Sequence, residues 1–140
     1  MEGRFTILIA DRNRHVREFL QRELMAEGYS VKTARSGREV LTMADGQDHP
    51  DLIILDLEIS PVSGLIILED LEKREPPIPV VVYTLLTEYR DHPVVKKAAA
   101  FLEKKGDNVD AFKTKVVNAL KSYYPNRFLS IQKGGETKEK

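Results

Sequence analysis

The stretch that decides the fold reads Pro50-Asp51-Leu52-Ile53-Ile54-Leu55-Asp56. Its central residues, Leu52–Leu55, are all apolar, so a strand formed by them has no side that suits water. The run Val80-Val81-Val82-Tyr83 has nearly the same character. Strands that are apolar on both faces are typical of parallel sheets with helices packed on each side. These two runs therefore predict a parallel sheet that is covered on both faces.

Three further short runs complete a set of five predicted strands. The set is Phe5–Ala10, Ser30–Ala34, Leu52–Leu55, Val80–Tyr83 and Phe101–Glu103. The last residues of these runs lie at positions 10, 34, 55, 83 and 103, so successive ends are at least 20 residues apart. Each gap is long enough for a crossover helix and too long for a hairpin. Right-handed crossovers then favour an open, doubly wound α/β sheet.

The first three segments between the strands carry helix signals. Asn13 is a suitable N-cap for the first helix, and Gly28 ends its apolar pattern. The second segment opens on the capping box Ser36-Gly37-Arg38-Glu39. A third helix is expected over about Gly64 to Lys73, before a pair of prolines.

The last part of the chain is predicted with less regular structure. Pro93 can open a fourth helix, but few residues separate it from the next strand, so we expect this helix to be short or irregular. Asp107 or Asn108 caps the fifth helix. The helical pattern is lost after Tyr124. We therefore expect one domain over residues 1–124 and a flexible C-terminal tail over residues 125–140, in which Phe128, Leu129 and Ile131 could dock.

Composition excludes several classes of protein. The 140 residues contain no Cys, and 22 basic residues balance 22 acidic ones. Disulfide scaffolds and thiolate zinc sites are thereby excluded, and a reducing, cytoplasmic setting is favoured. Balanced charge provides no broad positive field for nucleic acid. No apolar run is long enough for a membrane span or a signal sequence, so neither nucleic acid nor a membrane is an expected partner.

Polar side chains follow four of the predicted strands directly. They are Asp11, Asp56, Thr84 and Lys104. Because the carboxyl ends of parallel strands meet at one edge of the sheet, where such sheets bind their ligands, these groups are expected to converge. Two acids, a hydroxyl and an ammonium would then form one small polar site.

The chain resembles the receiver domain of two-component response regulators from about Arg4 to Tyr124. Four stretches carry the resemblance: Ile7–Asp11, Pro50–Asp56 with Gly64 eight positions later, Pro79–Thr84, and Phe101–Lys104. It implies a flavodoxin-like (βα)5 sheet with strand order 2-1-3-4-5. It also implies a signalling protein rather than an enzyme, in which Asp56 accepts a phosphoryl group from a histidine kinase or a phosphotransfer protein.

The resemblance also implies roles for the neighbours of Asp56. Lys104 would pair with one phosphoryl oxygen, and Thr84 would form a hydrogen bond with another. Movement of Thr84 would leave space for Phe101, which makes these two residues the expected switch. Mg²⁺ would be held by Asp11, Asp56 and the backbone carbonyl of Glu58.

Three positions depart from the family pattern, and one of them, Lys105 in place of a proline, carries little weight. Receivers usually carry two adjacent acids after the first strand, but the second position here is Arg12. This changes the local charge by two units at the place where a divalent ion would bind. The resulting repulsion, on the order of several kcal/mol, disfavours binding of a metal ion. The guanidinium either turns outward into water or bridges Asp11 and Asp56. Leu85 replaces a small residue and either narrows the access to Asp56 or packs sideways.

Two functions remain open from the sequence. The first is a single-domain response regulator that signals by docking to a downstream protein, because the residues after Tyr124 are too few for a DNA-binding domain. The second is a phosphorylation-independent pseudo-receiver with Arg12 in place of the metal-site acid. A homodimer through the face of the fourth and fifth helices is a family possibility. A flavin enzyme is disfavoured, because Arg12-Asn13-Arg14 stands where a phosphate-binding loop would be.

Overall fold

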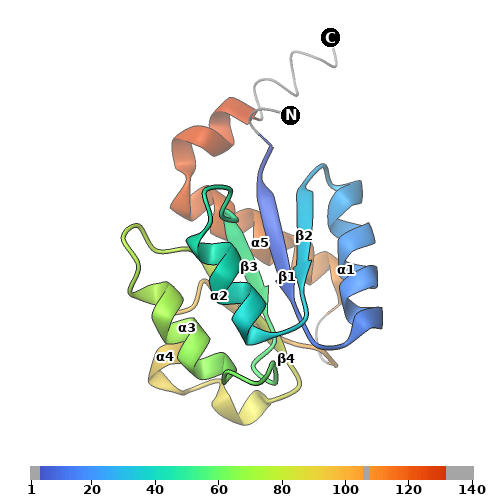
Figure 1. Cartoon of the computed structure of the whole chain (residues 1–140). Helices are drawn as coiled ribbons and strands as arrows, with labels where there is room; N and C mark the ends of the chain where they lie inside the picture. Colours follow the sequence, from blue (N-terminus) through green and yellow to red (C-terminus); the bar gives the residue numbers. More distant parts are fainter. Residues whose placement is uncertain (1–3, 106–107, 132–140) are drawn as a thin grey trace.

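Five parallel strands form one sheet in the order β2-β1-β3-β4-β5 (Figure 1). The computed structural model describes residues 4–105 and 108–131. The strands are β1 Thr6–Ala10, β2 Ser30–Ala34, β3 Leu52–Leu55, β4 Val80–Thr84 and β5 Ala100–Glu103. This order confirms the flavodoxin-like sheet that the sequence analysis expects. The strand bounds differ from the predicted ones by one residue at most.

Helices cover both faces of the sheet, as the apolar strands require. They are α1 Arg14–Ala26, α2 Gly37–Asp45, α3 Gly64–Glu72, α4 Pro93–Lys96 and α5 Val109–Tyr123. In Figure 1, α2 and α3 lie in front of the sheet and α5 lies behind it. Alternate residues of β3 point to opposite faces: Ile53 packs in the core with α2 and α3, whereas Ile54 packs in the core with α1 and α5. Burial on this scale stabilises by about 1.5–3 kcal/mol for each large apolar side chain.

Local signals account for the ends of the helices. The side chain of Asn13 accepts a hydrogen bond from the backbone of Val16, and Gly28 has a φ of 95°, a conformation that favours glycine. Ser36 caps α2 through Glu39 N, but the Glu39 carboxylate accepts from the backbone of Arg35, so the capping box forms in one direction only. Asn108 caps α5, and Asp107 lies outside the described residues.

The fourth helix is short, as predicted. A 3₁₀ turn over Thr87–Tyr89 precedes it, and α4 itself comprises only Pro93–Lys96. Proline stands at the first helical position, where its missing N–H leaves no intrahelical bond unmade. In the part of the chain that the structure describes, no helix combines the length and the apolar character needed to cross a membrane.

The segment that follows α5 differs from the flexible tail expected over residues 125–140. Residues 125–131 are helical, and residues 132–140 lie outside the described part. The Arg127 guanidinium donates to both carboxylate oxygens of Asp51, at 2.7 and 3.1 Å. The Phe128 ring is buried, with its centroid 6.4 Å from that of Phe5. These contacts hold the segment at the end of the sheet where β1 begins (Figure 1).

Gly64 fixes the approach of α3 to the loop after β3. A Cβ atom at this position would lie 2.6 Å from both the Cα and the carbonyl oxygen of Leu57, which is the residue after Asp56. Because backbone atoms form this contact, no side-chain movement relieves it. The first turn of α3 therefore depends on glycine to support the loop that carries Asp56.

The variant Gly64→Ala is expected to lower the free energy of unfolding by about 1–3 kcal/mol, because the new methyl group forces the loop or the helix to shift. Urea denaturation measures this change. The matched control is Gly46→Ala, whose Cβ would meet its nearest neighbour at an ordinary 3.6 Å. Equal stability changes in the two variants would contradict the close approach of α3.

Candidate functional site

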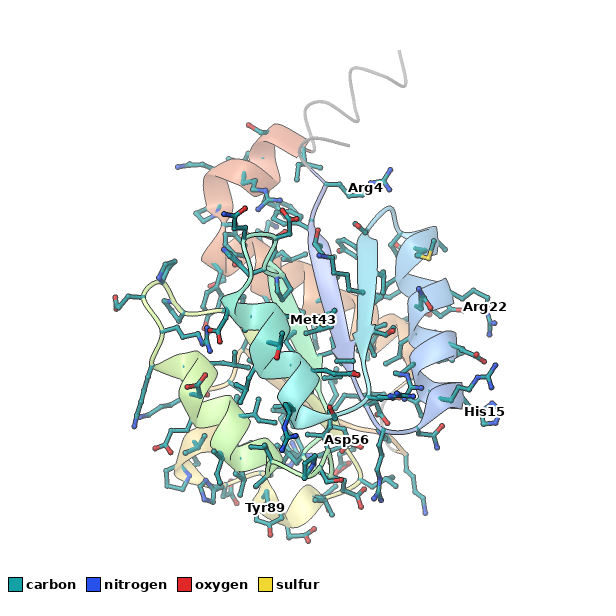
Figure 2. All side chains as sticks on the ribbon, in the orientation of Figure 1. Arg4, His15, Arg22, Met43, Asp56 and Tyr89 are labelled. Carbon is teal, nitrogen blue, oxygen red and sulfur yellow. The ribbon has the colours of Figure 1, made fainter. Side chains whose placement is uncertain are left out.

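The four polar side chains predicted after the strands meet at the carboxyl edge of the sheet. Lys104 Nζ lies 2.6 Å from Asp11 Oδ2 and 2.9 Å from Asp56 Oδ2. The Thr84 hydroxyl donates a 2.8 Å hydrogen bond to Asp56 Oδ1. Figure 2 shows Asp56 at this end of the strands, on the same side as Tyr89 and opposite Arg4. The convergence expected from the sequence is therefore present.

The site is buried and its charges are paired. Asp11 and Asp56 are each 3% exposed, and Thr84 is fully buried. Burial lowers the pKa of Lys104, but hydrogen bonds and charge attraction from Asp11 and Asp56 outweigh it, so the pKa is raised above 10.5. Lys104 is therefore an ammonium ion at neutral pH. Its charge offsets the repulsion between two carboxylates that are held together away from water.

In each carboxylate, one oxygen accepts a hydrogen bond from the backbone of its own loop, and the other faces Lys104. Asp11 Oδ1 accepts from the backbone N–H of Asn13 at 2.8 Å, and Asp56 Oδ1 accepts from that of Glu58 at 3.1 Å. The Oδ2 atom of each carboxylate faces Lys104. These short turns after β1 and β3 aim both carboxylates at the same ammonium group.

The Arg12 side chain turns outward, which is one of the two orientations expected from the sequence. Its side chain is 60% exposed, and its Nη2 atom lies 3.5 Å from Glu58 Oε2. The bridge between Asp11 and Asp56 is instead made by Lys104. The pairing of Arg12 with Glu58 joins the loop after β1 to the loop after β3.

The residues around Thr84 form the side of the site nearest β5. Leu85 turns toward solvent, with 49% of its surface exposed, and the backbone N–H of Leu86 donates to Thr84 Oγ1 at 3.2 Å. On β5, the centroid of the Phe101 ring lies 4.6 Å from Arg90 Cζ, with the guanidinium over the ring. Arg90 Nη2 also pairs with Glu103 Oε1 at 2.9 Å. No sequence pattern predicts this contact, because Arg90 lies in an irregular loop with no periodic signal.

The donor set can be compared with the needs of Mg²⁺. The oxygen donors would be Asp11, Asp56 and the carbonyl of Glu58, yet the two carboxylates already face Lys104, and the Glu58 side chain faces Arg12. Within residues 4–105 and 108–131, no group of three His, Cys, Asp or Glu side chains is placed to hold a metal ion. Lys104 therefore already supplies positive charge between the two carboxylates that would hold a divalent cation.

The sequence matches the family model of the response regulator receiver domain over residues 7–116. The chain belongs to this family. The receiver domain matches the response regulator MprA of Mycolicibacterium vanbaalenii with 38% identity over 78 residues, which is 56% of this chain and 33% of that protein. It thus spans about a third of the length of the curated relatives that it matches.

Solved structures agree with the receiver fold. The response regulator TrrA of Thermotoga maritima, solved in complex with Mg²⁺ and BeF, is 32% identical with a TM-score of 0.74, and the match covers 83% of this chain and 99% of TrrA. TrrA has also been solved in complex with the histidine kinase ThkA, and that match has 32% identity, a TM-score of 0.72 and coverage of 83% and 98%. The chemotaxis response regulator CheY4 of Vibrio cholerae, at 23% identity, supports the fold alone.

The variant Lys104→Met is expected to destabilise the receiver domain by about 3–5 kcal/mol at pH 7, because it leaves two buried carboxylates facing each other without a cation. Urea denaturation tests this expectation, with Lys105→Met at the exposed neighbouring position as the control. A Lys104→Met variant as stable as the wild type would show that the bridge contributes nothing.

The pH dependence of this difference has a definite sign. The pKa of Lys104 is raised in the folded state from an ordinary value of 10.5. Its contribution is therefore complete below about pH 10.5 and is lost as the pH rises through the folded-state value. We expect the stability gap between wild type and Lys104→Met to be constant near neutral pH and to shrink above pH 10.5. A gap that widened over this range would contradict the pairing.

Proposed function

We propose that the chain accepts a phosphoryl group on Asp56 and passes on the signal through an altered surface. The observation that carries the proposal is the double contact of the buried Asp56 carboxylate, with Lys104 on one oxygen and Thr84 on the other. A carboxylate oxygen attacks phosphorus, the bond from phosphorus to the donor atom breaks, and an acyl phosphate forms on Asp56. This chemistry depends on placing and neutralising the phosphoryl oxygens.

Lys104 and Thr84 have separate roles in this proposal. The ammonium already lies against the acceptor carboxylate, so it can pair with a phosphoryl oxygen as the group arrives. The Thr84 hydroxyl now donates a hydrogen bond to Asp56 Oδ1. After phosphorylation it would donate instead to another phosphoryl oxygen. This exchange would change the contacts of Phe101 on β5 and so alter the outer face of the domain.

The proposed partners are a histidine kinase or phosphotransfer protein and a downstream protein target. The complex of TrrA with ThkA supports the first, since TrrA shares this fold and 32% of the aligned residues. We propose that this domain, with the helical segment over residues 125–131 packed on it, acts in the cytoplasm and signals by docking. A homodimer through α4, β5 and α5 is one form that such docking could take.

Acetyl phosphate provides a direct test of the acceptor. We expect intact-mass measurement to show a gain of one phosphoryl group in the wild type, and no gain in Asp56→Asn, because an amide does not attack phosphorus. The control is Asp91→Asn, at an exposed position in the loop before α4. A gain that survives Asp56→Asn would place the acceptor elsewhere.

A second candidate is a phosphorylation-independent pseudo-receiver. It is favoured by the pairing of Lys104 with both carboxylates and by Arg12 in place of the usual acid, which together place two positive charges near Asp11 and Asp56 without a metal ion. Such a domain would bind its target in one fixed conformation. In that case the wild type would gain no phosphoryl mass, and Mg²⁺ would leave its folding stability unchanged.

A further inference from the structure

Arg12 lies in the loop after β1, and its side chain pairs with Glu58 in the loop after β3. Ala10 and Leu55 are paired in the sheet, so the loops after β1 and β3 begin side by side. The backbone of the first loop is fixed, because Asn13 N donates to Asp11 Oδ1 and Arg17 Nη1 donates to the Asp11 carbonyl at 2.7 Å. Arg12 is therefore anchored at its backbone, directly beside the site.

The side chain of Arg12 reaches toward the second loop. Its guanidinium approaches Glu58, whose backbone N–H is bonded to the acceptor Asp56. The contact with Glu58 is 3.5 Å long, beyond the usual length of a hydrogen bond, and the side chain is 60% exposed. An arginine has five donor hydrogens, so most of its donors remain available for an incoming group.

The charge of the incoming group creates a need that Lys104 alone does not meet. A phosphoryl group on Asp56 carries about 1.5 to 2 negative charges and replaces the single charge of the carboxylate, in a site that already holds the Asp11 carboxylate. Lys104 is shared between Asp11 and Asp56 before the group arrives. A second cation is required, and in this chain the position that would hold a metal-binding acid holds a guanidinium instead.

We propose that Arg12 takes the place of a metal ion by binding the phosphoryl oxygens during transfer, so that Asp56 is phosphorylated without a divalent cation. The planar guanidinium leaves Glu58 and turns over Asp56, where two of its N–H groups fit two phosphoryl oxygens. An Asp56 oxygen forms the bond to phosphorus, and the bond to acetate breaks when acetyl phosphate is the donor. Acetate leaves with the electron pair, and Arg12 and Lys104 retain their protons.

This inference rests on the proposed role of Asp56 as acceptor, and one experiment separates the two. The wild type is incubated with acetyl phosphate either in buffer with excess EDTA or with Mg²⁺, and the phosphoryl mass gain is followed over time. We expect the two initial rates to agree within about twofold. In EDTA, Arg12→Ala is expected to be phosphorylated at least about tenfold more slowly than the wild type. An arginine that contacts the transition state contributes far more than this in other phosphoryl transfers.

Two further variants complete the design. Arg12→Asp restores an acid beside Asp11 and is expected to make phosphorylation depend on Mg²⁺. Lys105→Ala removes one exposed positive charge next to Lys104 and should retain the wild-type rate in EDTA. Urea denaturation of each variant distinguishes a lost contact from a lost fold.

The outcomes are distinct. Phosphorylation of the wild type with Mg²⁺ alone overturns the role of Arg12 and leaves Asp56 as the acceptor. The role of Arg12 is also overturned if Arg12→Ala is phosphorylated in EDTA at the same rate as the wild type. Absence of phosphorylation in both buffers overturns the inference together with the proposed function.

Discussion

The ammonium group of Lys104, held between two buried carboxylates, is the interaction on which the rest of the site depends. It extends from the end of β5, at one edge of the sheet, past β4 to residues that follow β3 and β1. Without it, Asp11 and Asp56 would be like charges in a place that water scarcely reaches. The same group that makes the fold tolerate these acids also lies where an incoming phosphoryl group needs positive charge.

The fold supplies this arrangement through its regularity, and the loops adjust it. Parallel strands end at one edge, so the residues after β1, β3 and β5 meet without any special sequence between them. Short turns then direct each carboxylate, through Asn13 N and Glu58 N. Arg12 lies in one of these turns and Glu58 in the other, which places the unusual cation of this chain beside the acceptor.

The sequence predicted what depends on local pattern. The apolar run of β3, the cap at Asn13 and the short α4 follow from neighbouring residues, and so does the polar edge of the sheet. Contacts between distant residues that do not lie at the strand ends were not predictable in this way. The helix over residues 125–131 is held by Arg127 on Asp51, 76 positions earlier, and the choice of Arg12 between two orientations depends on Glu58, 46 positions later. The spacing of apolar residues along the chain gives no information about which distant residues pair in this way.

The pairing of Lys104 with two carboxylates can be measured through the protonation of its side-chain amine. A heteronuclear NMR titration that follows the side-chain amine of Lys104 would give its pKa in the folded protein. We expect a pKa above the ordinary 10.5, and a fall in this pKa when Asp11→Asn removes one of the two carboxylates. A pKa at or below 10.5, unchanged by Asp11→Asn, would show that burial outweighs the pairing and would contradict the bridge as the basis of the site.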